Sequence, residues 1–257
     1  PAYEEMNWLV HGFSTRFGGV SRGIYSSMNL SFTRGDEGSC VKENYRRIAQ
    51  AIGFRTDDIV TSDQTHTANV RKVTEADRGK GITVPRDYQD VDGMVTNVPG
   101  LVLTTFYADC VPLYFVDPVK CVIGLSHSGW RGTVAKIGKA TVEKMKEEYG
   151  CHPEDILAAI GPSICQDCYE VSEDVIEEFK TAFAGEYQER LYYKKKNGKY
   201  QLNLWKANES VFLESGILPE HIAVTNVCTH CNPDILFSHR TTGNERGTLS
   251  AFLALKK

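Results

Sequence analysis

One cysteine and two histidines stand where this sequence could bind a metal ion. Cys110 comes directly before an apolar run, His127 directly follows a second one, and His66 lies between two short β-like segments. Zinc binds cysteine sulfur and histidine nitrogen, and a catalytic zinc has three protein ligands and an open fourth position. Alternatively, the histidines are structural hydrogen-bonding residues and the cysteine is a small hydrophobe. The positions indicate a candidate metal site but leave that alternative open.

A rival site consists of two C-x-x-C pairs, Cys165/Cys168 and Cys228/Cys231. The gap between the pairs is far longer than the roughly 15–20 residues of a compact zinc ribbon. A chain of this size also does not need a metal ion in order to fold. A redox pair would need its first cysteine at a helix N-terminus, whereas the next helix is expected to be capped by Ser172. We therefore expect Cys168 and Cys231 to serve packing, with a four-cysteine zinc site as the disfavoured alternative.

A glycine-flanked arginine could bind an anion. The turn Gly-Trp-Arg-Gly (129–132) lies just before a helix expected to start near Val134. Free backbone N–H groups at a helix N-terminus attract anions, and Arg131 offers a bidentate fork for phosphate or carboxylate. Arg16, in the segment Ser-Thr-Arg-Phe-Gly-Gly, is a second candidate. The alternative is an ordinary surface turn.

The elements that must position these residues can be predicted from periodicity. Strands and helices mix without strict alternation, which favours a mixed α/β sheet in a single domain spanning residues 1–257. Short apolar runs predict buried strands at 101–106, 111–116, 121–126, 156–161 and 222–227. Helical spacing and caps predict helices over 39–53 with Ser39 as cap, over 134–149, after Ser172, and from Asn203 to near Gly216. The polar stretch 192–199 predicts a solvated hairpin or loop tip.

Composition excludes several classes of protein. The chain has 257 residues, 41% of them apolar, and a net charge of −4, so no global positive field would attract nucleic acid. No apolar stretch approaches the roughly 20 residues of a membrane span. The acidic N-terminus does not look like a signal peptide. We therefore expect a cytoplasmic protein whose eight cysteines are free thiols, metal ligands or catalytic groups.

Several separated motifs together resemble one family. These are HGFSTRFGGVSRGIYSSMNL, SDQTH, TFYADCVPLYFVDP, IGLSHSGWRGT, AAIGPSICQDCYEV and CTHCNPDILFSHR. They are similar to the multi-activity purine nucleoside phosphorylases, long labelled polyphenol oxidase or laccase-domain proteins. The resemblance implies one α/β domain with layered helices and sheets. It implies metal ligands at His66, Cys110 and His127. The chain departs from the family pattern at Thr65, Thr67, Ser128 and Tyr45, none of which removes a ligand.

The resemblance also implies two reactions. These are phosphorolysis of adenosine, inosine, guanosine and methylthioadenosine, and deamination of adenosine, with zinc as cofactor and purine nucleoside and phosphate as partners. Arg131, Arg16 and Gln64 are the candidate substrate- or phosphate-binding residues. The chain lacks the H-x-E signature of one class of zinc deaminases, so the proton shuttle stays open. Its candidates, besides catalytic roles for Cys110 and His127, are Asp109, Asp92 and Glu170, although strand alternation would turn Asp109 away from Cys110.

Three other functions remain as alternatives. A multicopper laccase is excluded, because the chain has seven histidines and no H-x-H pair, but a weak phenol oxidase with one copper ion is not. A Cys-His amide hydrolase would use Cys110 as nucleophile and His127 as base, acting on a cell-wall precursor as has been suggested for relatives. A partner-binding domain without catalysis is the third alternative. Neither nucleic acid nor a membrane is expected as a partner.

Overall fold

The computed structural model describes residues 6–183 and 188–257 and has a mixed α/β fold, as predicted. Its strands are β1 (Leu9–Phe13), β2 (Ile59–Thr61), β3 (Val70–Lys72), β4 (Gly93–Thr96), β5 (Val102–Tyr107), β6 (Val111–Asp117), β7 (Val122–Ser128), β8 (Leu157–Ile160), β9 (Glu170–Val171), β10 (Tyr192–Lys194), β11 (Tyr200–Leu202), β12 (Ile222–Val224) and β13 (Leu249–Leu255). A six-stranded sheet has the order β12-β8-β6-β7-β4-β3, and a four-stranded sheet has the order β1-β13-β5-β2. A small third sheet has the order β10-β11-β9.

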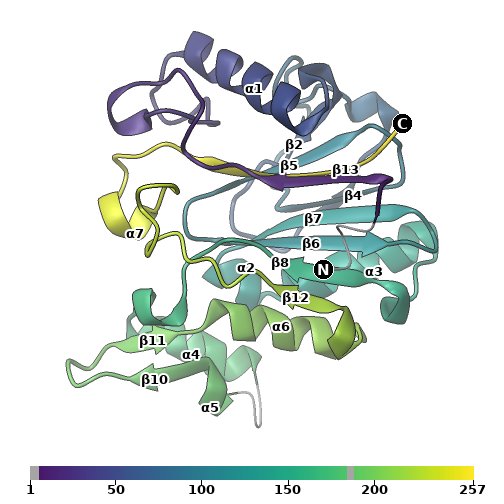
Figure 1. The fold of residues 1–257 in the computed structure, drawn as a ribbon. Coiled ribbons are helices and arrows are strands. Elements are labelled where there is room, and N and C mark those ends of the chain that lie inside the picture. Colours follow the sequence, from purple (N-terminus) through teal and green to yellow (C-terminus); the bar gives the residue numbers. More distant parts are fainter. Residues whose placement is uncertain (1–5, 184–187) are drawn as a thin grey trace.

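Helices cover the outer faces of the two larger sheets (Figure 1). The α-helices of the described residues are α1 (Gly38–Ile52), α2 (Trp130–Val134), α3 (Ile137–Tyr149), α4 (Glu173–Ala182), α5 (Gln188–Leu191), α6 (Leu204–Glu214) and α7 (His239–Thr242). Helix α1 packs on the four-stranded sheet, whereas α3 and α6 pack on the six-stranded sheet. No helix within the described residues combines the length and apolar character needed to cross a membrane.

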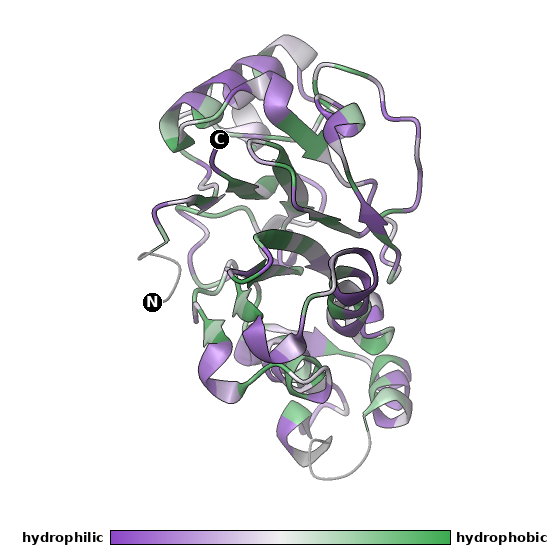
Figure 2. Ribbon diagram, turned by 90° about the vertical axis from the view of Figure 1, so that its right-hand side faces the viewer, coloured by the Kyte–Doolittle hydropathy of each residue, from purple (hydrophilic) through white to green (hydrophobic). Residues whose placement is uncertain are grey.

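Three apolar layers hold the sheets and helices together. Strand β13 contributes to two of them, because alternate side chains of a strand point to opposite faces. Its Leu249, Ala251 and Leu253 pack between the two larger sheets, whereas Phe252 and Ala254 pack toward α1. The third layer lies between the six-stranded sheet and its helices. Burial on both faces explains why the central strands are hydrophobic throughout, as Figure 2 shows.

The β6–β7 hairpin brings two candidate ligands to one edge of the six-stranded sheet. The strands pair antiparallel from Val111↔Ser128 to Asp117↔Val122, so the start of β6 lies beside the end of β7. The turn is closed by Asp117, whose carboxylate accepts hydrogen bonds from two backbone N–H groups of the turn. Cys110, just before β6, and His127, near the end of β7, therefore lie at the same end of the hairpin.

Most predicted elements are confirmed, including the hairpin β10–β11 and the cap of α6 by Asn203. Four details were wrong. Helix α1 begins one residue earlier, with Glu37 as N-cap, so Ser39 lies inside the helix. The segment 134–149 is interrupted: α2 ends at Val134, and α3 follows Lys136, which has a positive φ of 56°. His127 lies within β7 rather than after it, and β12 is shorter than predicted.

Candidate metal centre and active site

The three predicted metal ligands come together. The nearest ligand atoms of His66, Cys110 and His127 all lie within 4.8 Å of one another. The Cys110 Sγ atom is 4.0 Å from His66 Nε2, and the two imidazole rings are nearly perpendicular with centroids 4.9 Å apart. A tetrahedral zinc ion places its sulfur and nitrogen ligands about 3.6 Å apart. The donor set and its spacing therefore fit one zinc ion with one position left for water or substrate.

The buried carboxylate of Asp92 orients the ring of His127 and the backbone that carries His66. Its Oδ1 atom lies 2.8 Å from His127 Nδ1, so the Nε2 atom of that ring is left for a metal. The same carboxylate accepts hydrogen bonds from the backbone N–H groups of Thr65, His66 and Thr67. These bonds hold His66 at a positive φ of 68°, where a residue with a side chain is uncommon. Asp92, a candidate proton shuttle in the sequence, is thus an orienting residue.

The site is electrostatically suited to hold a cation. Burial alone would raise the pKa of Asp92, but hydrogen bonds from His127 and from the backbone of Thr67 lower it to about 2. Burial would also raise the pKa of Cys110, yet the charge and hydrogen bond of His127 lower it to about 6. Burial would lower the pKa of His127, whereas the thiolate of Cys110 and the Asp92 carboxylate raise it to about 9. The thiolate that zinc requires is therefore available at neutral pH, whereas His127 must give up a proton to bind the ion.

The glycine that opens the Gly-Trp-Arg-Gly turn provides space for these ligands. A Cβ atom on Gly129 would lie 2.8 Å from His66 Cδ2 and 3.1 Å from Cys110 Sγ. The turn was predicted to bind an anion through Arg131, but α2 has only five residues and the Arg131 guanidinium lies over the Trp130 ring, 4.3 Å from its centroid. In the structure, the turn lets the backbone approach the three candidate metal ligands closely.

An open cavity of about 890 Å³ lies in front of the ligands, and all three line it. This volume is within the range of pockets that bind small molecules. Basic side chains from distant segments share its wall. They are Arg34, Lys42, Arg86 and Arg246.

Arg246 is the most unusual of these basic residues. The residue is buried, with a relative accessibility of 6%, and its Nε atom has no hydrogen-bond partner among the described residues. Its Nη1 atom donates to the carbonyl of Gly247. Burial, with a smaller contribution from Arg34, lowers the pKa of Arg246 to about 10, so it is still charged at neutral pH. Sequence reasoning missed Arg246, because it lies in an irregular segment without a motif.

The arginines and the glutamine predicted from sequence have other contacts. Arg16 donates hydrogen bonds to the carbonyls of Ser26 and Pro233 and braces the N-terminal segment. Within the described chain, neither Arg16 nor Arg131 belongs to the cavity wall. Gln64 does line the cavity, but its amide pairs with both the N–H and the carbonyl of Phe106. It therefore positions the segment that leads to His66.

The carboxylates of two candidate proton shuttles make their polar contacts with residues other than the metal ligands. Asp109 precedes β6 and has a positive φ of 87°, so strand alternation does not apply to it. Its carboxylate accepts hydrogen bonds from the Thr229 hydroxyl, at 2.6 Å, and from the Arg240 backbone, also at 2.6 Å. Glu170 pairs with Lys195 at 2.6 Å. The contacts of Asp109 and Glu170 are those of structural residues.

Comparisons with known proteins agree with the motifs. The sequence is 36% identical over 253 residues to purine nucleoside phosphorylase YlmD of Bacillus subtilis (strain 168), which covers 97% of this chain and 89% of that protein. It is 36% identical over 240 residues to adenosine deaminase RL5 of an unknown prokaryotic organism, covering 93% and 91%. The crystal structure of the hypothetical protein YfiH of Bacillus licheniformis has a TM-score of 0.93 at 34% identity, covering 98% of this chain and 95% of that one. Residues 10–256 match the family described as multi-copper polyphenol oxidoreductase laccase, and the chain belongs to this family.

Proposed function

We propose that this protein is a zinc-dependent enzyme that cleaves purine nucleosides with phosphate and also deaminates adenosine. One observation carries the proposal: the metal-ligand set of His66, Cys110 and His127 shares a cavity with the buried, incompletely paired Arg246. A metal centre beside an anion-binding group suits a reaction between phosphate and a neutral nucleoside. The relatives named purine nucleoside phosphorylase and adenosine deaminase support the same substrate class.

The donor set fits zinc better than copper, the metal that the family's description names. Multicopper oxidases need several copper ions and many histidines, whereas this group contains two histidines and one cysteine. A single copper ion with weak phenol oxidase activity is therefore the less favoured assignment. Zinc bound by His66, Cys110 and His127 would supply a Lewis acid that polarises the substrate or activates water.

The chain's own residues would bind and orient the substrates. Arg246 would hold phosphate through its free guanidinium N–H groups, so that a phosphate oxygen faces C1′ of the ribose. The bond between C1′ and the purine nitrogen breaks as the new C–O bond forms, and the leaving base takes up the proton that hydrogen phosphate gives up. Asp92 would keep His127 in one tautomer and orientation throughout. Adenosine, inosine, guanosine and methylthioadenosine are the proposed substrates.

The phosphate site can be tested with two arginine variants. Arg246→Gln should raise the KM for phosphate in inosine phosphorolysis by roughly ten- to hundredfold, the value of a charge-assisted contact. Arg131→Gln is the matched control, because Arg131 stacks on Trp130. It should leave the phosphate dependence unchanged. Zinc content and the Tm of both variants show that the fold is retained. A normal phosphate KM in Arg246→Gln, or a defect confined to Arg131→Gln, contradicts the assignment.

A second candidate function rests on the low pKa of Cys110 beside His127. A thiolate next to an imidazole could act as nucleophile and base in amide hydrolysis. The two functions respond differently to reagents. A chelator should abolish activity in the zinc enzyme and zinc should restore it. Activity that survives complete zinc removal but is lost with iodoacetamide favours the hydrolase.

A further inference from the structure

A second group of possible metal ligands lies outside the active site. Its members are the four cysteines of the two C-x-x-C pairs, hereafter the four-cysteine cluster: Cys165, Cys168, Cys228 and Cys231. Strands β8 and β12 are parallel neighbours, and their pairing continues beyond the strands through a bridge between Ser163 and Cys228. The loops after β8 and β12 therefore run side by side. The long sequence gap between the two pairs argued against this site, but parallel strand pairing brings the pairs together in the fold.

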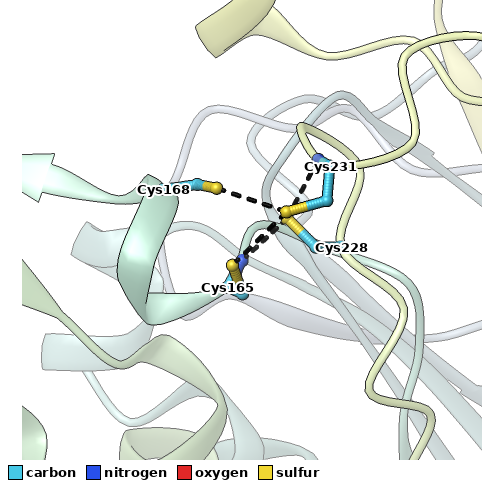
Figure 3. A group of neighbouring side chains, drawn as sticks. All are labelled: Cys165, Cys168, Cys228 and Cys231. Carbon is cyan, nitrogen blue, oxygen red and sulfur yellow. Dashed lines mark hydrogen bonds between the residues drawn. The ribbon is translucent and has the colours of Figure 1, made fainter.

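The sulfur positions fit a single tetrahedral ion. All four Sγ atoms lie within 4.8 Å of one another, and Figure 3 shows the side chains converging. Cys231 Sγ lies 3.4 Å from Cys168 Sγ and 4.0 Å from Cys165 Sγ. Four thiolates around zinc are about 3.8 Å apart, given Zn–S bonds of about 2.3 Å. A disulfide would join only two of the four and needs a bond of about 2.05 Å.

The backbone around the cluster stabilises a thiolate. Cys228 Sγ accepts hydrogen bonds from the backbone N–H groups of Cys165, at 3.3 Å, and Cys231, at 3.4 Å. Each C-x-x-C pair thus directs one N–H group at the same buried sulfur. Such bonds would orient a metal-bound cysteine in the way that outer partners orient metal ligands generally. Cys231 is exposed, which gives an ion a path to the cluster.

We propose that the four-cysteine cluster is a second zinc site, a closed structural one with four thiolate ligands. The cation clamps the loop after β8 to the loop after β12. Its closed ligand set leaves no position for substrate, in contrast to the site at His66, Cys110 and His127. The assignment of Cys168 and Cys231 to packing is therefore replaced.

The clamp also supports the active site through Asp109. Ile164, next to Cys165, donates its backbone N–H to the Asp109 carbonyl at 3.0 Å. Thr229, next to Cys228, donates its hydroxyl to the Asp109 carboxylate at 2.6 Å. Asp109 directly precedes Cys110. Both clamped loops thus hold the residue that positions an active-site ligand.

Zinc stoichiometry of the full chain tests the proposal. Protein loaded with Zn²⁺ and freed of excess metal should contain two zinc ions per chain. Cys168→Ser and Cys231→Ser should each contain one, and the second variant remains informative if the first does not fold. His66→Ala should also contain one, so loss of the active-site metal is distinguished from loss of this site. Cys121→Ser, which alters another exposed cysteine, is the control and should keep two.

Thiol protection and thermal unfolding give independent readouts. Zinc should protect the cysteines of the cluster from iodoacetamide, as mapped by peptide mass, and a chelator should expose them. In the His66→Ala background, zinc removal should lower Tm by roughly 5–15 °C. This shift is expected when the dissociation constant of the zinc ion lies far below the free zinc concentration. One zinc ion per chain that disappears in His66→Ala overturns the proposal. So does a disulfide found by mass spectrometry under non-reducing conditions, or iron in place of zinc.

Discussion

Two cysteine-containing groups in this chain have similar donor spacing but different surroundings. The group of His66, Cys110 and His127 faces a cavity of about 890 Å³ and has three donors. The four-cysteine cluster has four donors, and none of its members is among the described residues that line that cavity. An open position beside a substrate-sized space is typical of catalysis, whereas a closed sulfur set is typical of structural zinc. The surroundings, rather than the donors alone, distinguish the two proposed functions.

The largest expected effect separates the two groups directly. Cys110→Ser replaces the proposed zinc ligand by a poorer donor of nearly the same size. The fold should survive while phosphorolysis falls by about a thousandfold or more, several kcal/mol of transition-state stabilisation. Zinc should fall by one ion per chain. The matched variant, Cys231→Ser, should lose one ion as well but retain turnover at low temperature. Comparable turnover in the two variants would falsify the division into catalytic and structural sites.

Removing the orienting carboxylate should have a smaller effect. Asp92→Asn keeps the size of the side chain but weakens its bonds to His127 and to the backbone at 65–67. Loss of a residue that hydrogen-bonds to a metal ligand typically lowers metal affinity about 10- to 100-fold. Competition with a chromophoric chelator measures the affinity of the active-site zinc in a Cys231→Ser background. Glu170→Gln, which alters an acid paired with Lys195, is the control and should leave that affinity unchanged.

A single methyl group at Gly129 should weaken the same site. The added Cβ of Gly129→Ala would lie within 3.1 Å of both His66 and Cys110, so at least one ligand must move. We expect zinc affinity to fall by roughly tenfold, within the range seen when ligand orientation is disturbed. Gly38→Ala is the control, because no atom lies within 4 Å of its added Cβ. Equal zinc affinity in the two variants would show that the close approach at Gly129 has no role in metal binding.

The sequence pointed to the three candidate metal ligands through residue type and position, and the family resemblance pointed to the same residues. Cys110 and His127 lie at one end of an antiparallel hairpin, and His66 lies between β2 and β3. The short apolar runs placed these residues near strand ends but left a structural role open. Arg246 could not be found in this way, since its importance comes from burial and from a missing partner in the folded chain. Neither property has a local signature in sequence.

The four-cysteine cluster shows a different limit of sequence reasoning. The C-x-x-C pairs were recognised, but their separation along the sequence was taken to mean that they are also far apart in the folded chain. Parallel strands need a long crossover connection, and here the connection between β8 and β12 contains α4, α5 and α6. The parallel register of Ala158 with Ile222 then places the following loops side by side. The sequence predicted both strands but did not show that they pair.

The smallest expected effect tests whether the two groups are coupled through Asp109. Thr229→Val removes the hydroxyl that donates to the Asp109 carboxylate at 2.6 Å and leaves a buried carboxylate oxygen without that partner. The free energy of unfolding should fall by about 1–3 kcal/mol. We also expect kcat/KM to fall by a few fold, because Asp109 precedes Cys110, while both zinc ions remain bound. Thr104→Val is the matched control: Thr104 is equally buried, and its hydroxyl has no hydrogen-bond partner among the described residues. It should cost little or no stability and leave kcat/KM unchanged. If the two variants have the same kcat/KM, the four-cysteine cluster stabilises the fold without positioning the active-site ligand.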